Sequence, residues 1–191
     1  MSIIYQHIIK YWIPLAVGIT LLCGLVYVTV QQNYRQSAND PQIQIVEDVI
    51  AAIAGGQKPE EMLGTNTKTD ITKSLAVYVI IYDTEGKPIA STAQLDGKDP
   101  VVSKGVLDIA KANGENRITW QPKENVRSAI VVKPFTAATS GFVLVGRSLR
   151  EIEQREGQMT NMIAIALAIS LVATLLATVV TMWVTTKLAK K

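Results

Sequence analysis

The chain has 191 residues, of which 48% are hydrophobic and 18% charged, and its formal net charge is +3. This length allows one ordinary domain with membrane segments, or two small domains. The hydrophobic residues are concentrated, because the stretches 11–30 and 162–184 contain no charged residue and no histidine. This pattern excludes a freely soluble enzyme and a transporter with many spans.

Both charge-free stretches are long enough to cross a membrane. As α-helices they would extend about 30 and 35 Å, against a hydrocarbon core of about 30 Å. The sequence predicts transmembrane helices at 11–31 and 159–185, short tails at 1–10 and 186–191, and an exposed domain at 32–158. No small-x-small cleavage site follows the first stretch, so we expect an uncleaved anchor in the lipid bilayer rather than a signal peptide.

The charges favour one orientation. All 16 acidic residues lie between Asp40 and Glu156, whereas both tails are basic and free of acids. Basic tails of this kind favour a cytoplasmic location. Arginines also flank the spans on the domain side, but long domains are translocated largely regardless of charge. We therefore expect the domain outside and both termini in the cytoplasm.

The sequence of the exposed domain predicts an α+β fold. Asp40-Pro41 predicts a helix start with Asp40 as the capping residue, and Gly55-Gly56 predicts its end. A polar loop follows at 57–69, with room for one helical turn. Alternating or continuous apolar runs predict strands, and 3.6-residue spacing predicts further helices. The strands are expected at 74–82, 88–92, 116–121, 126–133 and 141–147, and the helices at 103–113 and from 149 into the second span. These elements predict a five-stranded antiparallel sheet with flanking helices.

Catalytic side chains are scarce in this domain. The single histidine, His7, precedes the first span and the single cysteine, Cys23, lies within it. The carboxylate pairs at 83/85 and 96/99 fall in predicted turns, where aspartate is favoured for its hydrogen bonds to the backbone. Their spacing differs from that of a calcium loop. We therefore predict no enzymatic activity, no metal and no cofactor.

Residues suited to binding are better represented. Trp120 is the one tryptophan of the exposed domain, and Arg127 lies on the next predicted strand. With Tyr78, Tyr82 and Arg117 they could form a pocket in which an arginine beside aromatic rings holds a carboxylate. The alternative is that the aromatic rings fill the core and the arginines are exposed. Both interpretations stay open at this point.

The second span carries a row of small side chains. Ala166, Ser170, Thr174 and Thr178 recur every four residues. Rows of this kind allow helix backbones to approach closely in lipid. The partner helix could be the first span, a second copy of the chain or another protein.

The order of elements resembles a known family. A span, an amphipathic helix, an antiparallel sheet with a helical crossover, and a helix entering a second span resemble a single Cache (extracellular PAS-like) sensor domain. The resemblance covers residues 40–156, and its best local features are residues 79–89, 117–122 and 141–149. Such domains form the sensing part of bacterial histidine kinases and chemoreceptors.

The resemblance implies a function. We expect a bacterial inner-membrane protein whose domain binds a small organic or amino acid between the sheet and its helices. It further implies a homodimer or a separate signalling partner, and no nucleic acid. Receptors of this kind continue into an output domain, whereas here only Thr185–Lys191 follow, so we expect signalling through a partner chain. The alternatives are the sensor portion of a longer histidine kinase or chemoreceptor, and a structural or interaction adaptor without ligand.

Overall fold

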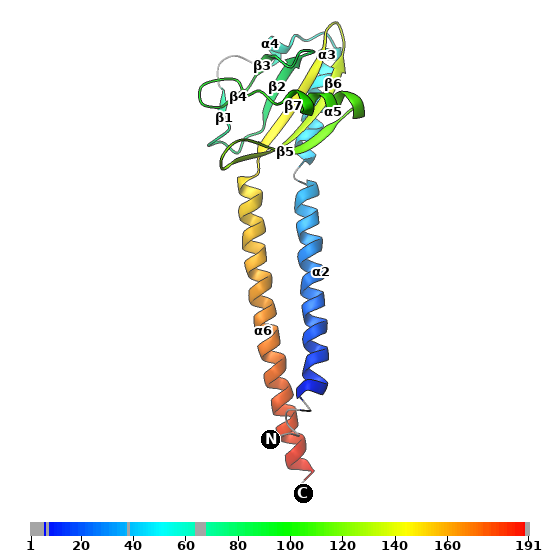
Figure 1. Ribbon diagram of the computed structural model, residues 1–191, viewed down its shortest axis with the longest axis vertical. Coiled ribbons are helices and arrows are strands. Elements are labelled where there is room, and N and C mark those ends of the chain that lie inside the picture. The colour runs from blue at the N-terminus through cyan, green and yellow to red at the C-terminus, as the bar shows by residue number, and fades with distance from the viewer. Residues whose placement is uncertain (1–5, 7, 38, 64–67, 190–191) are drawn as a thin grey trace. The chain divides into compact units, whose positions relative to one another are not determined.

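The computed structural model describes residues 6, 8–37, 39–63 and 68–189 (Figure 1). His7 and part of the predicted loop at 57–69 lie outside the described residues. The chain divides into two units, which we call the helical unit (residues 1–34 and 154–191) and the head (residues 35–153).

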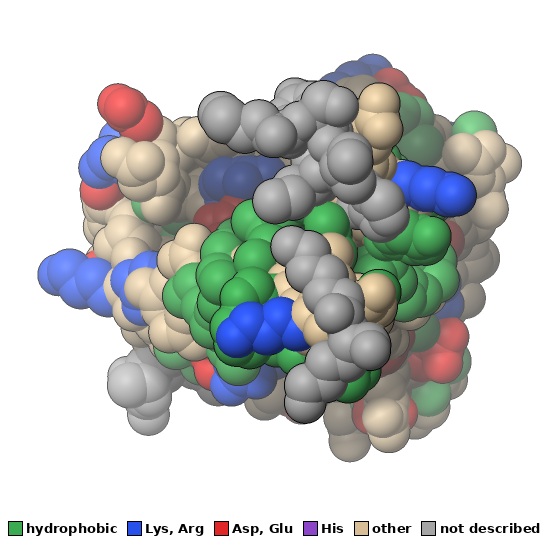
Figure 2. Space-filling view, turned by 90° about the horizontal axis from the view of Figure 1, so that it is seen from below, with side chains coloured by type: hydrophobic (Ala, Val, Ile, Leu, Met, Phe, Trp, Pro, Cys, Tyr) green, Lys and Arg blue, Asp and Glu red, His purple; other side chains and the backbone are tan. Residues whose placement is uncertain are grey.

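The helical unit contains a π-helical turn, η1 (Ile8–Trp12), the helix α2 (Ile13–Ser37) and most of α6 (Arg150–Leu188). Two helical stretches, Ile8–Tyr34 and Arg150–Leu188, are long enough to span a membrane, and each contains a segment apolar enough to do so. Large aliphatic side chains on them are widely exposed, including Leu21 at 69%. Such exposure of aliphatic side chains is unfavourable in water and suits lipid. Figure 2, seen from below, shows apolar side chains gathered near the centre of the view, with basic and acidic side chains around them.

Within its described residues, 35–37, 39–63 and 68–153, the head contains ten short elements. Its helices are α3 (Asp40–Ala54), α4 (Pro59–Met62) and α5 (Lys104–Asn113). Its strands are β1 (Thr69–Asp70), β2 (Tyr78–Asp83), β3 (Pro88–Ser91), β4 (Ala93–Gln94), β5 (Asn116–Lys123), β6 (Val126–Thr136) and β7 (Ser140–Ser148). The predicted α+β class with a five-stranded antiparallel sheet is thereby confirmed.

The large sheet has the strand order β3-β2-β7-β6-β5, and every neighbouring pair is antiparallel. Helix α5 connects one edge of this sheet to the other, as expected for a helical crossover. The short strands β1 and β4 form a separate parallel pair, which the sequence pattern did not predict because two-residue strands have no measurable periodicity.

The sheet is covered on both faces. On one face, Val79, Ile81, Val131, Val143 and Val145 pack against the apolar side of α3. On the other face, alternate residues of the same strands pack against α5 and the segment that precedes it. Because successive side chains of a strand point to opposite faces, strands buried on both faces read as nearly continuous apolar runs.

The predicted start of one helix and the predicted start of one strand are wrong. Asp40 is the first residue of α3 rather than its cap; Asn39 occupies the capping position, and its side chain makes no capping hydrogen bond. Strand β2 begins at Tyr78 rather than at residue 74, because a turn occupies the preceding segment. There the Ser74 N–H donates to the Asp70 carbonyl at 2.9 Å, and the Ser74 hydroxyl accepts from Ala76 N–H at 3.0 Å.

Candidate functional site

Two of the predicted ligand-binding residues are in the core. Tyr78 and Tyr82 are 1% and 0% exposed and lie on the face of the sheet covered by α5. The Tyr82 hydroxyl donates to the Pro100 carbonyl at 3.1 Å, and burial raises the pKa of this phenol above its ordinary value. Both rings therefore fill space between the sheet and its covering layer.

Tyr78 lies over a glycine of the neighbouring strand. Tyr78 and Gly146 are paired across β2 and β7. A Cβ atom at Gly146 would come within 2.3–2.6 Å of the Tyr78 side chain, so only glycine leaves room for the ring. Burial raises the pKa of the Tyr78 phenol to about 12, and the nearby Ser128 hydroxyl offsets part of this effect. The phenol is therefore neutral at physiological pH.

Trp120 joins the same aromatic face. Its side chain is half-buried and packs, together with Ile118, against the core that contains Tyr78 and Tyr82. The structure thus brings the three predicted aromatic residues to one side of the sheet, where their rings pack against the apolar core.

The two predicted arginines project from the opposite face. Trp120 is paired with Ser128 across β5 and β6, so Arg127, one residue earlier, points away from the aromatic rings. Its side chain is 48% exposed, and its guanidinium forms an ion pair with Glu153. Arg117 directly precedes Ile118 on β5, so it also points to the opposite face of the sheet, and it forms an ion pair with Glu115. The structure therefore does not place either arginine beside the aromatic side chains.

A charged cluster, which consists of Glu47, Glu115, Arg117 and Lys133, connects α3 to the sheet. Lys133 Nζ lies 2.7 Å from Glu47 Oε1 and 3.2 Å from Glu115 Oε2. Hydrogen bonds from Arg117 and Lys133 lower the pKa of Glu115, whereas those to Glu47 and Glu115 raise the pKa of Lys133. All four charges are compensated within the cluster, which suggests a structural role.

A small cavity of about 60 Å³ lies where α6 begins. Its walls come from the turn after β1, the β5–β6 turn, the end of β7 and the first turn of α6. The lining residues are Ile71, Thr72, Asn125, Val126, Arg127, Ser148, Arg150 and Glu153. Arg127 was predicted as a binding residue, whereas the other polar members were missed. These residues come from four segments that lie apart in the sequence, so only the tertiary structure identifies them as neighbours.

Arg127 holds the start of α6 through two kinds of bond. Its backbone carbonyl accepts a hydrogen bond from Leu149 N–H at 2.9 Å, and its guanidinium donates to the Glu153 carboxylate. Arg150 extends the contact by donating from Nη2 to the Lys73 carbonyl at 2.7 Å. The first turn of α6 is thus bound to β6 and to the turn after β1.

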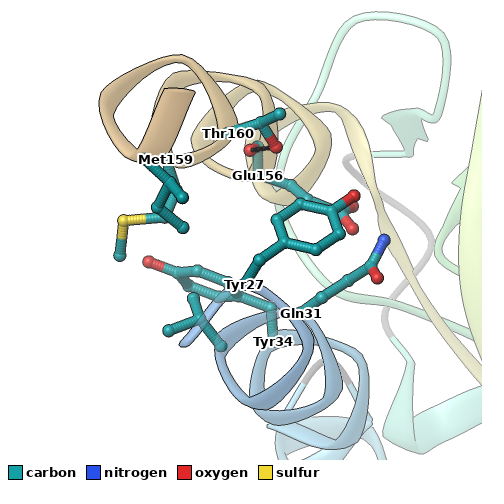
Figure 3. Close-up of a pocket in the computed structure, with 8 residues that line it drawn as sticks. Tyr27, Gln31, Tyr34, Glu156, Met159 and Thr160 are labelled. Carbon is teal, nitrogen blue, oxygen red and sulfur yellow. Dashed lines mark hydrogen bonds between the residues drawn. The ribbon is translucent and has the colours of Figure 1, made fainter. Parts of the chain in front are cut away.

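The helical unit contains a cluster of polar side chains at one end (Figure 3). Tyr27, Gln31 and Tyr34 of α2 project toward Glu156 and Thr160 of α6. The space among them is about 10 Å³, which accommodates no more than a water molecule. This cluster therefore offers no room for an organic ligand.

The predicted row of small residues has mixed surroundings. Ser170, Thr174 and Thr178 are half-covered, whereas Ala166 is exposed. The hydroxyls of Thr174 and Thr178 donate to carbonyls of their own helix at 2.8 Å. An open groove of about 530 Å³ is lined by Thr174 and Thr178 together with Tyr11 and Leu15 of the other helix. Beside this groove, Trp12 Nε1 donates to the Leu171 carbonyl at 3.2 Å, which joins the first apolar segment to α6 within the row.

Comparison with known proteins gives no relative. No family model, no curated protein and no solved structure matches this chain.

Proposed function

We propose that this chain is a two-pass protein of a bacterial inner membrane whose Cache/PAS-like head lies outside and senses a small organic or amino acid. The single observation that carries the proposal is the course of α6. This helix starts at the Arg127–Glu153 contact of the head and continues without interruption to Leu188, through the second apolar stretch. A change at its first turn can therefore be passed along one continuous helix toward a partner chain.

The fold supports the likeness to sensor domains. Numbered in chain order, the five large-sheet strands stand in the order second, first, fifth, fourth, third, and a helix crosses between the two edges. This is the antiparallel sheet with a helical crossover that the resemblance implies. Fold alone does not determine function, so the proposal requires a binding test.

The test is a solute screen on the full chain in detergent micelles. A ligand that binds only the folded state stabilises it by RT ln(1 + [L]/Kd), or about 2.7 kcal/mol at one hundred times its Kd. For a chain of this size we expect the melting temperature to rise by about 5–10 °C with at least one small carboxylic or amino acid. Neutral analogues in which an amide replaces the carboxylate are the matched controls. If no solute shifts the melting temperature, the sensing proposal is wrong.

The second candidate is an interaction adaptor of the inner membrane that needs no ligand. The filled aromatic face favours it, since Tyr78 and Tyr82 occupy the space in which the resemblance implies a ligand. In this case the screen gives no shift, and crosslinking in intact cells yields a defined complex with another envelope protein. Stabilisation by a small acid would contradict the adaptor role.

A further inference from the structure

The cavity at the start of α6 already contains one carboxylate, that of Glu153, bound to Arg127. We propose that a small organic acid binds here through its carboxylate, replaces Glu153 on Arg127 and thereby releases the first turn of α6. This inference rests on the proposed sensing function, for which it supplies a site and a ligand class. It places the ligand away from the aromatic face of the sheet.

The chemistry of the lining favours an anion. The lining residues include two arginines, Arg127 and Arg150, and one carboxylate, that of Glu153, so the lining has an excess of one positive charge. Thr72, Ser148 and Asn125 add hydroxyl and amide groups. The Thr72 hydroxyl donates to Asp70 at 2.6 Å, and Ser148 Oγ accepts from Arg150 N–H at 3.3 Å. Because both hydroxyls already have partners, the charged donors for a ligand are the two arginines. Planar guanidinium groups bind carboxylates with two parallel hydrogen bonds.

The size of the cavity favours the carboxylate end of a small acid. A volume of about 60 Å³ exceeds the space that a single water molecule needs and suits a group the size of acetate. The Glu153 side chain shows which chemical group Arg127 binds at this place. A free carboxylate is chemically equivalent to that group, so the exchange leaves Arg127 with a partner.

The exchange requires little energy because the existing ion pair is weak. The side chains of Arg127 and Glu153 are 48% and 40% exposed. Ion pairs with this exposure are screened by water, and their net contribution corresponds to no more than a few-fold change in an equilibrium constant. A dissolved acid at millimolar concentration can therefore compete with Glu153.

The position of Glu153 couples binding to α6. Glu153 N–H donates to the Leu149 carbonyl at 2.9 Å, and Leu149 N–H donates to the Arg127 carbonyl at 2.9 Å. The ion pair and these two bonds form a closed loop between β6 and the first helical turn. Loss of the ion pair removes one of the side-chain bonds that hold that turn and leaves the backbone bonds, the Arg150–Lys73 hydrogen bond and the Arg147–Glu151 pair, so we expect the turn to open more often.

The binding test uses sodium acetate and the full chain in micelles, with arginine labelled by ¹⁵N at Nε. The Nε–Hε signal that is absent from Arg127→Gln identifies Arg127, and Arg127→Lys retains the charge if the first variant does not fold. Acetate titrated against sodium chloride at constant ionic strength is expected to shift the Arg127 and Arg150 signals. The Arg117 signal, whose guanidinium pairs with Glu115 away from the cavity, is the internal control and should stay in place.

The competition test compares two variants of the same helix. Glu153→Gln removes the internal competitor, so the Kd for acetate should fall about 3- to 5-fold. Glu151→Gln is the matched control, since Glu151 pairs with Arg147 and does not line the cavity. Its Kd should stay within twofold of the parent value. Equal affinities of Glu153→Gln and the parent chain would overturn the exchange mechanism.

Hydrogen exchange tests the release of α6. Saturating acetate should speed exchange of the amides at 149–153 about 3- to 10-fold in the parent chain and leave Arg127→Lys unchanged. Binding without faster exchange would overturn the coupling, and shifts with phosphate but not with acetate would overturn the carboxylate assignment. If acetate does not bind while the solute screen still finds a ligand, this inference fails and the proposed sensing function stands.

Discussion

At the scale of single residues, the clearest dependence is that of the Tyr78 ring on Gly146. The ring is fully buried and lies where any side chain at position 146 would be. This glycine is required by close packing rather than by an unusual backbone angle. The aromatic face can therefore be disturbed by adding a single methyl group.

We predict that Gly146→Ala lowers the free energy of unfolding by about 1–3 kcal/mol, because the added Cβ overlaps the Tyr78 ring. The measurement is urea unfolding in micelles, followed by Trp120 fluorescence after Trp12 and Trp183 are replaced by Phe. Gly105→Ala on α5 is the matched control, since nothing lies within 4 Å of its added Cβ. It should stabilise the head by about 0.5–1 kcal/mol. Equal effects of the two substitutions would contradict the packing argument.

At the scale of elements, the charged cluster fastens α3 to strands β5 and β6. Glu115 and Lys133 are 23% and 19% exposed, so their interaction is less screened than that of pairs on the open surface. Their pKa values shift in opposite directions, that of Glu115 below 4.5 and that of Lys133 above 10.5. Both shifts mean that the folded head favours the charged forms.

The Glu115 shift predicts a loss of stability in acid. A carboxyl group whose pKa is lowered by folding contributes stability above its ordinary pKa of 4.5, and this stability is lost as the pH falls through the folded-state pKa. Glu115→Gln should lower the free energy of unfolding by about 1 kcal/mol at pH 7. The difference from the parent chain should shrink toward zero by about pH 3.

Unfolding curves at pH 7, 5, 4 and 3 measure this effect. Glu85→Gln, at an exposed position in the β2–β3 turn, is the control and should show a smaller difference at every pH. A Glu115→Gln effect that stays constant from pH 7 to pH 3 would show that the cluster does not act through the charge of Glu115.

At the scale of the whole molecule, the basic tails and the acidic exposed domain predict opposite sides of the membrane for residues 111 and 186. In a Cys23→Ser background, a membrane-impermeant maleimide should label Lys111→Cys in intact cells. Thr186→Cys should react only after lysis. The reverse pattern would place the head in the cytoplasm, and labelling of both sites would contradict a two-pass arrangement.

The elements could be predicted from the sequence because their signals are local. Charge-free stretches of 20 or more residues predict the spans, and the glycines after residues 54 and 113 end the helices where the structure ends them. The turn aspartate, Asp83, accepts hydrogen bonds from the N–H groups of Glu85 and Lys87 at 2.9 and 2.8 Å. The start of α3 lies one residue before the predicted one, and the start of β2 was less accurate because a turn occupies the segment before Tyr78.

The sequence by itself determined two apolar helices around an α+β head, because hydrophobic periodicity and charge act within each segment. Only the tertiary structure decided which side chains meet. Strand register sends Arg127 away from Trp120, since neighbouring positions of a strand face opposite sides. The fold then brings Arg127 to Glu153, 26 residues further along the chain. Such a contact depends on where β6 and α6 lie in space, which no local pattern encodes.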